Sequence, residues 1–187
     1  MKNQILKAMA GCALGVMSLA STAGAQPGQA STVVEQPTYT SIPLEIMVDR
    51  SAEEVWQRIG GYCDIEDWLQ LPCTITSGTE NGFGAVRSVG NEVLVGRTEL
   101  SYTYTQTVRE GRPYNLYHGT LEARPVTATT SKIIYTLFFD NSMLVDDAAR
   151  AADRERRVGV FTRALENMKT LAEGGTLPPR PARGGRQ

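Results

Sequence analysis

The fold is decided by residues 131–172, SKIIYTLFFDNSMLVDDAARAADRERRVGVFTRALENMKTLA, where the spacing of apolar residues changes. Across 131–140 apolar and polar side chains alternate, which predicts a strand with one buried face. From Val145 to about Ala172 the spacing becomes helical, and at ~1.5 Å per residue this helix is about 40 Å long. Its second half carries an apolar stripe, whereas residues 150–157 are charged on most faces. We expect this charged half to project beyond the core or to lie over an opening.

Short segments with alternating polarity fill most of the chain upstream of the long helix. Turn residues separate them at Asn81-Gly82, Gly90-Asn91, Gly111-Arg112-Pro113 and 125–130. Because the connections are short, these segments predict an antiparallel meander. Its strands are expected near 73–78, 84–89, 92–97, 101–109, 114–123 and 131–140.

A strand and two short helices are predicted before the meander. Apolar residues predominate over 42–48 and indicate the strand. Ser51 and Glu54 have the spacing of a capping box, in which each side chain accepts a hydrogen bond from the other residue's backbone, so a helix begins there. Gly60-Gly61 ends this helix, and a second helical turn is expected over Asp64–Leu69.

This order of elements predicts an α+β fold, with a seven-stranded curved antiparallel sheet wrapped on a long C-terminal helix and two short helices after the first strand. A sheet with one apolar face must bury that face, and the long helix has the length to cover it. A helix ~10 Å in diameter cannot fill the concavity of such a twisted sheet. We therefore expect a cavity between the sheet and the helix.

The first 25 residues have the features of a secretory signal peptide. Lys2 and Lys7 precede an apolar run, and the small residues Ala23-Gly24-Ala25 follow it. The run is shorter than the ~20 residues that span a bilayer, which argues against a membrane anchor and against stable membrane insertion. A lipoprotein signal at Cys12 is a further alternative. We expect cleavage after Ala25 and a periplasmic or secreted protein.

Length and charge limit the remaining possibilities. A chain of 187 residues with 41% hydrophobic content is typical of one folded domain. Its 19 basic residues do not exceed its 20 acidic ones, so the chain lacks the positive charge that binding to a nucleic-acid backbone requires. After a signal peptide at 1–25, we expect a flexible leader at 26–40, a folded domain at 41–173 and a disordered tail at 174–187.

Cleavage after Ala25 leaves two cysteines, Cys63 and Cys73, in an oxidising compartment. The segment between them, CDIEDWLQLPC, is short enough to form a closed loop, so we expect one disulfide that contributes roughly 3 kcal/mol. Two unpaired thiols are the alternative. No metal site is expected, because the single histidine lies far from both cysteines in the sequence.

Several motifs support a family resemblance. They are the Val55-Trp56 end of the first helix, the Gly60-Gly61-Tyr62-Cys63-Asp64-Ile65-x-x-Trp68 stretch, Cys73, Gly84-x-x-Arg87 and the Ser101-Tyr102-x-Tyr104 strand. Together they resemble the START-like (SRPBCC) superfamily, which includes the birch-pollen allergens and bacterial polyketide cyclase/dehydrase-like proteins, and the cysteine pair is similar to that of exported members. The resemblance covers about residues 42–172 and implies the helix-grip fold. It also implies binding of a hydrophobic or aromatic small molecule, or cyclisation, dehydration or condensation without a cofactor.

Alternation within the meander separates an inward face from an outward one. On 101–109 Tyr102 and Tyr104 share a face with Gln106, and the more polar set faces outward. The inward set predicts a cavity lined by tyrosines, whose rings form an apolar wall and whose hydroxyls orient a polar group. The alternative is that these rings fill the core. The expected ligand-binding residues are Trp68, Arg87, Tyr102, Tyr104, Gln106, Tyr117, Leu121, Ile133, Tyr135, Leu137, Phe161 and Leu165.

Three residues are the catalytic candidates. Arg97 and Glu99 fall near a hairpin turn, where Arg97 would bind a carboxylate, Glu99 would act as a base and Tyr104 would supply a hydroxyl. The alternative is that Arg97 and Glu99 form an ion pair at the surface, as such charged residues more often do. His118 alternates with the inward residues, so we expect it on the outer face, exposed or at a dimer contact, and outside the chemistry.

These observations favour an exported protein, monomeric or weakly dimeric, that holds a hydrophobic or aromatic small molecule between sheet and helix. A cofactor-independent cyclase, dehydratase or lyase that acts on an aromatic or polyketide-like substrate in the same cavity is the alternative. An ionisable side chain in the cavity would favour this enzyme. A third alternative is an envelope protein that contacts a partner through the charged half of the long helix.

Overall fold

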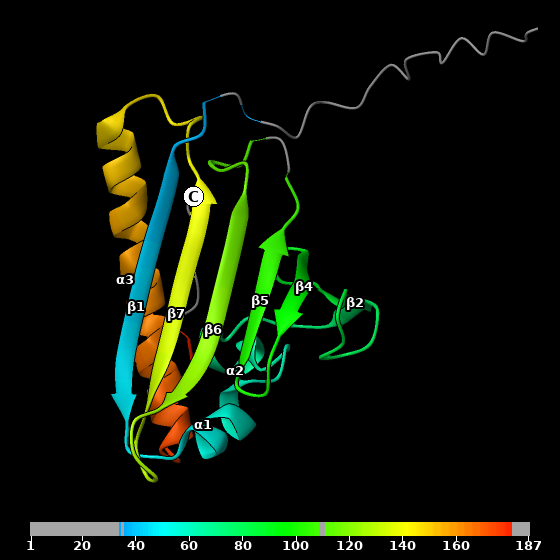
Figure 1. The fold of residues 1–187 in the computed structure, drawn as a ribbon, viewed down its shortest axis with the longest axis vertical. Coiled ribbons are helices and arrows are strands. Elements are labelled where there is room, and N and C mark those ends of the chain that lie inside the picture. The colour runs from blue at the N-terminus through cyan, green and yellow to red at the C-terminus, as the bar shows by residue number, and fades with distance from the viewer. Residues whose placement is uncertain (1–33, 35, 109–110, 181–187) are drawn as a thin grey trace, which may run out of the picture. The chain divides into compact units, whose positions relative to one another are not determined.

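The computed structural model describes residues 34, 36–108 and 111–180 of the chain. These residues form a seven-stranded antiparallel sheet, two short helices and one long helix (Figure 1), which confirms the predicted α+β architecture. The strands are β1 (Tyr39–Val48), β2 (Ile75–Ser77), β3 (Val86–Arg87), β4 (Glu92–Arg97), β5 (Ser101–Gln106), β6 (Tyr117–Pro125) and β7 (Ser131–Asp140). The helices are α1 (Ala52–Ile59), α2 (Ile65–Leu69) and α3 (Asp147–Ala172).

The sheet is a meander whose last strand also pairs with the first. Its strand order is β1-β7-β6-β5-β4-β3-β2, and every neighbouring pair is antiparallel. β1 and β7 each have 10 residues and pair along their whole length, with Ile42 opposite Leu137. In Figure 1, α3 lies along one face of the sheet, and α1 and α2 lie beside the C-terminal half of α3. The inner face of the sheet is therefore covered by helices.

Local sequence signals set the short helices. The Ser51 hydroxyl accepts a hydrogen bond from the Glu54 backbone at 3.3 Å, and the Glu54 carboxylate accepts one from the Ser51 backbone at 3.0 Å, so the predicted capping box is present. Gly60 caps the end of α1, where a Cβ would collide with the Trp56 ring. α2 ends at Gln70, which adopts a left-handed conformation with φ of 52°.

The strands at the edge of the meander are shorter than the sequence predicted. The segment 84–89 contributes only the two residues of β3, because Gly84 and Gly90 adopt positive φ angles of 82° and 68° and turn the backbone on either side. The segment 73–78 contributes only Ile75–Ser77. The edge strand β2 therefore offers little backbone to another sheet, whereas the opposite edge is the 10-residue β1.

The first half of α3 does not project beyond the core. Asp153 and Arg157 are only 8% and 6% exposed and pack against the sheet, although the surrounding sequence is highly charged. Leu165, Met168 and Leu171 of the predicted apolar stripe are buried, but Val158 and Phe161 are only half-buried. α3 is therefore held to the sheet along much of its length, partly by the Arg157 guanidinium, which lies over the rings of Tyr117 and Phe139.

The predicted segment boundaries differ from the structure at two places. β1 begins at Tyr39, so the last two residues of the expected leader belong to the sheet. Residues 174–180 of the expected disordered tail have defined positions, and the Gln70 side chain donates a hydrogen bond to the carbonyl of Pro178 at 2.8 Å. The expected signal peptide lies outside the described residues. Among the described residues, no helix is long and apolar enough to cross a membrane.

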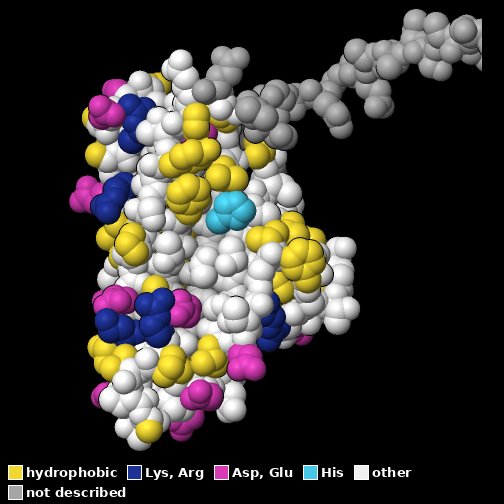
Figure 2. All heavy atoms as spheres, viewed as in Figure 1, with side chains coloured by type: hydrophobic (Ala, Val, Ile, Leu, Met, Phe, Trp, Pro, Cys, Tyr) yellow, Lys and Arg dark blue, Asp and Glu magenta, His cyan; other side chains and the backbone are white. Residues whose placement is uncertain are grey.

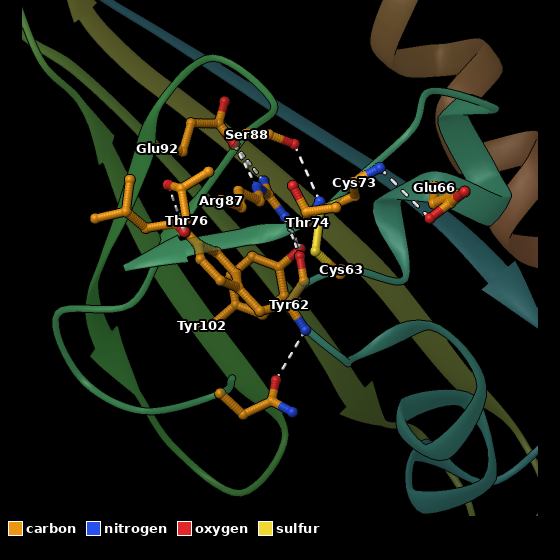
Figure 3. Close-up of a disulfide and its surroundings, with 12 residues drawn as sticks. Tyr62, Cys63, Glu66, Cys73, Thr74, Thr76, Arg87, Ser88, Glu92 and Tyr102 are labelled. Carbon is orange, nitrogen blue, oxygen red and sulfur yellow. Dashed lines mark hydrogen bonds and ion pairs between the residues drawn. A yellow bond between two sulfur atoms is a disulfide. The ribbon is translucent and has the colours of Figure 1, made fainter. Parts of the chain in front are cut away.

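The predicted disulfide is present between Cys63 and Cys73 (Figure 3), with 5.5 Å between the two Cα atoms. It closes the loop that contains α2. The Glu66 carboxylate, on α2 within this loop, accepts a hydrogen bond from the Cys73 backbone at 3.4 Å. The bridge therefore ties α2 to the strand segment that leads into β2.

Candidate functional site

A cluster of four tyrosines lies on the inner face of the sheet, beneath α3. The strand alternation places Tyr102 and Tyr104 (β5), Tyr117 (β6) and Tyr135 (β7) on this face, and all four are buried as predicted. The Tyr104 and Tyr135 hydroxyls are hydrogen-bonded at 2.9 Å. The ring of Tyr104 lies 6.5 Å from that of Tyr102 and 6.3 Å from that of Tyr117, measured between centroids. Because these rings contact one another, side chains occupy this part of the space in which the sequence predicted a cavity.

A buried ion pair lies at the edge of this tyrosine cluster. Arg87 of β3 is fully buried and Glu92 of β4 is 4% exposed, because the register of the hairpin places them opposite each other. The Arg87 Nε donates to Glu92 Oε2 at 2.6 Å, and Nη2 makes an ion-pair contact with the same oxygen at 2.5 Å. Arg87 Nη1 donates to the Tyr62 carbonyl at 2.6 Å, as Figure 3 shows.

Aromatic rings surround the Arg87 guanidinium. Its carbon lies 4.4 Å from the ring centroid of Tyr62, 4.9 Å from that of Tyr104 and 5.7 Å from that of Tyr102. Each ring can attract the cation through its electron-rich face, and such attraction is strongest where water is excluded. The ion pair and the tyrosine cluster therefore form one aromatic and charged centre.

Hydrogen bonds and ring contacts continue this centre toward the first half of α3. The Gln106 amide donates to Glu92 Oε1 at 2.7 Å, and the Tyr114 hydroxyl donates to the Gln106 carbonyl oxygen. The Arg157 guanidinium lies 5.4 Å from the ring centroid of Tyr114, and its Nε donates to Asp153 at 2.7 Å. Two buried ion pairs are thus connected through Gln106 and Tyr114 across the inner face.

Burial changes the acid–base properties of these groups. Burial raises the pKa of Glu92, although the Arg87 charge and the hydrogen bond from Gln106 oppose this effect. Burial also raises the pKa of Tyr104 and Tyr135 well above the ordinary value and raises the pKa of Tyr117 to about 12, so these phenols are neutral at physiological pH. Neutral phenols can donate hydrogen bonds to a ligand, and a carboxyl with a raised pKa can accept or donate a proton.

The structure does not place the three catalytic candidates in one environment. Arg97 and Glu99 are exposed, whereas Tyr104 is buried. Glu99 lies in the turn between β4 and β5, and Arg97 Nη1 donates to the Asn81 carbonyl at 2.8 Å. The ionisable residues that do share the inner face with Tyr104 are Arg87 and Glu92.

His118 lies on the outer face of the sheet, as predicted. It stands opposite Phe138 in the β6–β7 register, on the side away from α3. Figure 2 shows this outer face, with the single histidine of the chain at the surface near apolar side chains. Partial burial lowers the pKa of His118, which favours the neutral imidazole.

The sequence missed five residues of this centre, namely Tyr62, Glu92, Tyr114, Asp153 and Arg157. A signal was present for Glu92, because it alternates with the buried Leu94 on β4. Tyr62 lies in a loop, where strand periodicity does not apply. Tyr114 also lies in a loop, because β6 begins at Tyr117 and not at residue 114 as predicted. Arg157 lies in the charged half of α3, where solvent exposure is the usual expectation.

The remaining predicted ligand-binding residues surround the cluster. The Trp68 and Phe161 rings both contact Tyr135, with centroid distances of 6.2 and 4.7 Å. Trp68 also lines a groove of about 310 Å³ between α2, α3 and residues 177–180, which we call the α2–α3 groove. The other predicted residues, Leu121, Ile133, Leu137 and Leu165, are buried. Among the described residues, no group of three or more His, Cys, Asp or Glu side chains is placed to hold a metal ion.

Comparisons with known proteins agree with this architecture. The chain resembles a structure from Thermobifida fusca (22% identity, TM-score 0.60, covering 74% of this chain and 97% of that one). It also resembles ZhuI aromatase/cyclase from a Streptomyces species (16%, 0.56, 74% and 100%) and norcoclaurine synthase from Thalictrum flavum (12%, 0.57, 80% and 99%). A search of curated proteins found no match. Residues 39–173 match the family described as polyketide cyclase/dehydrase and lipid transport, and the chain therefore belongs to that family.

Proposed function

We propose that the protein binds a small hydrophobic or aromatic molecule with a polar substituent between the inner face of its sheet and α3. The observation that carries this proposal is the fully buried Arg87–Glu92 pair inside a wall of tyrosine rings. A core does not require such a pair, since replacing a buried ion pair by apolar residues is often neutral or stabilising. Aromatic walls with a few polar groups are typical of small-molecule sites.

Binding at this site requires some of the tyrosine rings to separate. Phe161 is a side chain of α3 that lies against the Tyr135 ring, and it is only half-buried, so its rotation uncovers that ring without breaking an ion pair. An aromatic ligand then replaces the ring contacts of Phe161, and its polar group replaces one tyrosine hydroxyl. In both exchanges the ligand makes a contact of the same kind as the one that the protein loses.

Native mass spectrometry of protein purified from its own compartment tests this proposal, followed by extraction and identification of retained molecules. We expect a stoichiometric aromatic or otherwise hydrophobic ligand. We also expect Tyr104→Phe to weaken rebinding of the extracted molecule, whereas the exposed Tyr39→Phe does not. A protein that retains nothing, and that no hydrophobic or aromatic compound of a panel stabilises against heat, would contradict the proposal.

An acid–base cyclase or dehydratase on the same site is the second candidate, and Glu92 favours it. Its carboxyl has a raised pKa and lies beside a permanent cation and neutral phenols, which suits proton transfer to and from a bound carbonyl compound. The test is turnover of the identified ligand and its analogues by the native protein, by Glu92→Gln and by the exposed control Glu99→Gln. Turnover that Glu92→Gln abolishes and Glu99→Gln retains supports the enzyme, and absence of turnover leaves binding as the function.

We also propose that the protein is exported and cleaved after Ala25. The apolar run near the N-terminus and the Cys63–Cys73 disulfide support this location, since disulfides persist in oxidising compartments. N-terminal sequencing of the native protein should begin at Gln26. An intact N-terminus in a cytosolic fraction would contradict export.

A further inference from the structure

The α2–α3 groove is a cavity at the surface, outside the tyrosine cluster. It has a volume of about 310 Å³, within the range of small-molecule sites. It lies where α2, the second half of α3 and the segment after α3 meet. Its lining consists of Trp68, Leu69, Gln70, Val160, Arg163, Ala164, Asn167, Leu177, Pro178, Pro179 and Arg180.

Hydrogen bonds hold the walls of this groove in place. The Asn167 side chain of α3 donates to the Trp68 carbonyl of α2 at 2.9 Å. Gln70, held in its left-handed conformation, donates to the Pro178 carbonyl at 2.8 Å and so fixes the segment after α3. The groove is therefore a built feature of the fold, with walls from three segments that these contacts join.

The walls of the groove are mainly apolar and contain a buried donor without a partner. Leu69, Val160 and three consecutive residues, 177–179, supply the accessible apolar surface, whereas Trp68 and Ala164 are 0% and 1% exposed and lie behind it. The indole N–H of the fully buried Trp68 has no hydrogen-bond partner among the described residues. Buried donors are normally paired, so the unpartnered indole is an exception in this part of the fold.

The charge of the groove is one-sided. Its lining includes Arg163 and Arg180 but no carboxylate among the described residues. Among the described residues, Arg180 donates to the Leu69 carbonyl alone, at 3.4 Å, and none forms an ion pair or hydrogen bond with the Arg163 side chain. This local excess of positive charge contrasts with the whole chain, whose 20 acidic residues outnumber its 19 basic ones. An anion that brings an apolar body fits both features.

We propose that the α2–α3 groove is a second binding site, which takes a small amphipathic carboxylate. The carboxylate interacts with Arg163 and Arg180 at the rim, and the apolar body lies against Leu69, Val160 and the two prolines. This site is independent of the proposed function. Trp68 is the one predicted inner-face residue that belongs to its lining. Planar guanidinium groups suit carboxylates, since they present paired N–H donors.

Titration calorimetry of the disulfide-bonded protein with decanoate, and with the uncharged decanol, tests the proposal. We expect decanoate to bind at least about 5-fold more tightly than decanol, and added salt to reduce this preference. Arg163→Gln should weaken decanoate binding about 3- to 5-fold and leave decanol binding unchanged. Arg154→Gln, which removes an exposed arginine of the same helix outside the groove, should change neither affinity.

The position of the probe is read from side-chain amide signals in NMR spectra. We expect decanoate to shift the Asn167 and Gln70 signals, because both residues line the groove. A shift of the Gln106 signal without these two would place the probe in the inner-face site and overturn the proposal. Equal affinities for acid and alcohol, an unchanged affinity in Arg163→Gln, or no binding of either probe would also overturn it.

Discussion

Gly119→Ala tests the packing on which the inner-face site depends. Gly119 of β6 lies under the Tyr104 ring, and a Cβ there would approach the ring to less than the 3.0 Å that real Cβ contacts essentially never show. The ring must therefore move, which costs about 1–3 kcal/mol as overpacking. Loss of the Tyr104–Tyr135 hydrogen bond adds about 0.5–1.5 kcal/mol. We expect a loss of about 1.5–4.5 kcal/mol, or roughly 3–18 °C in Tm.

Urea unfolding and thermal melting of matched variants measure this effect. Gly159→Ala on α3 is the control, because a Cβ there meets no atom within 4 Å, and it should stabilise the protein by about 0.5–1 kcal/mol. In the double variant Gly119→Ala/Tyr104→Ala the collision is absent, so the two changes should cost clearly less together than the sum of the single changes. Additive costs, or a Gly119→Ala variant within about 0.5 kcal/mol of the native protein, would refute the packing argument.

Three further predictions concern stability. Asp140 is buried, and although burial opposes its ionisation, hydrogen bonds from the Ser142 and Thr38 backbones and other donors hold its pKa below the ordinary value. The Asp140 carboxylate therefore stabilises the fold above pH ~4, and this stabilisation is lost as the pH falls through the lowered pKa. Asp140→Asn should cost about 1–3 kcal/mol of unfolding free energy at neutral pH and less in acid, as measured by urea unfolding. An equal cost in acid would contradict this reasoning. Cys63→Ser/Cys73→Ser should lose roughly 3 kcal/mol, and unfolding midpoints that match the oxidised protein would show that the loop constraint is unimportant. Ser51→Ala should cost about 1 kcal/mol in the same assay through loss of the cap of α1, and no change would mean that solvent replaces this bond fully.

Local patterns explain why much of the fold was predictable. Period-two alternation on residues 101–106 determines which side chains face the helix, and the structure buries Tyr102 and Tyr104 accordingly. The spacing of Ser51 and Glu54 determines where α1 begins. These features depend on residues close in sequence, so a pattern of a few residues is enough to predict the buried face of a strand or the first residue of a helix.

Two features of the site could not be predicted in the same way. A charged residue is usually exposed. Arg157 is buried because three aromatic rings from distant parts of the chain surround it, whereas its ion-pair partner Asp153 lies one helical turn away. The filling of the space under α3 is likewise a property of volumes, since alternation shows which rings face inward but not whether they touch. Pairing between distant residues and the fit of their side chains require three-dimensional coordinates.

The pairing of β1 with β7 has a consequence for the order of folding. The first strand of the domain finds its partner only in the last strand, and α3 follows still later, so the sheet cannot close until nearly the whole domain has been synthesised. Contacts between such distant segments slow folding, because a long loop must be ordered before they form. We expect the nascent chain to complete its sheet only after β7 has been synthesised.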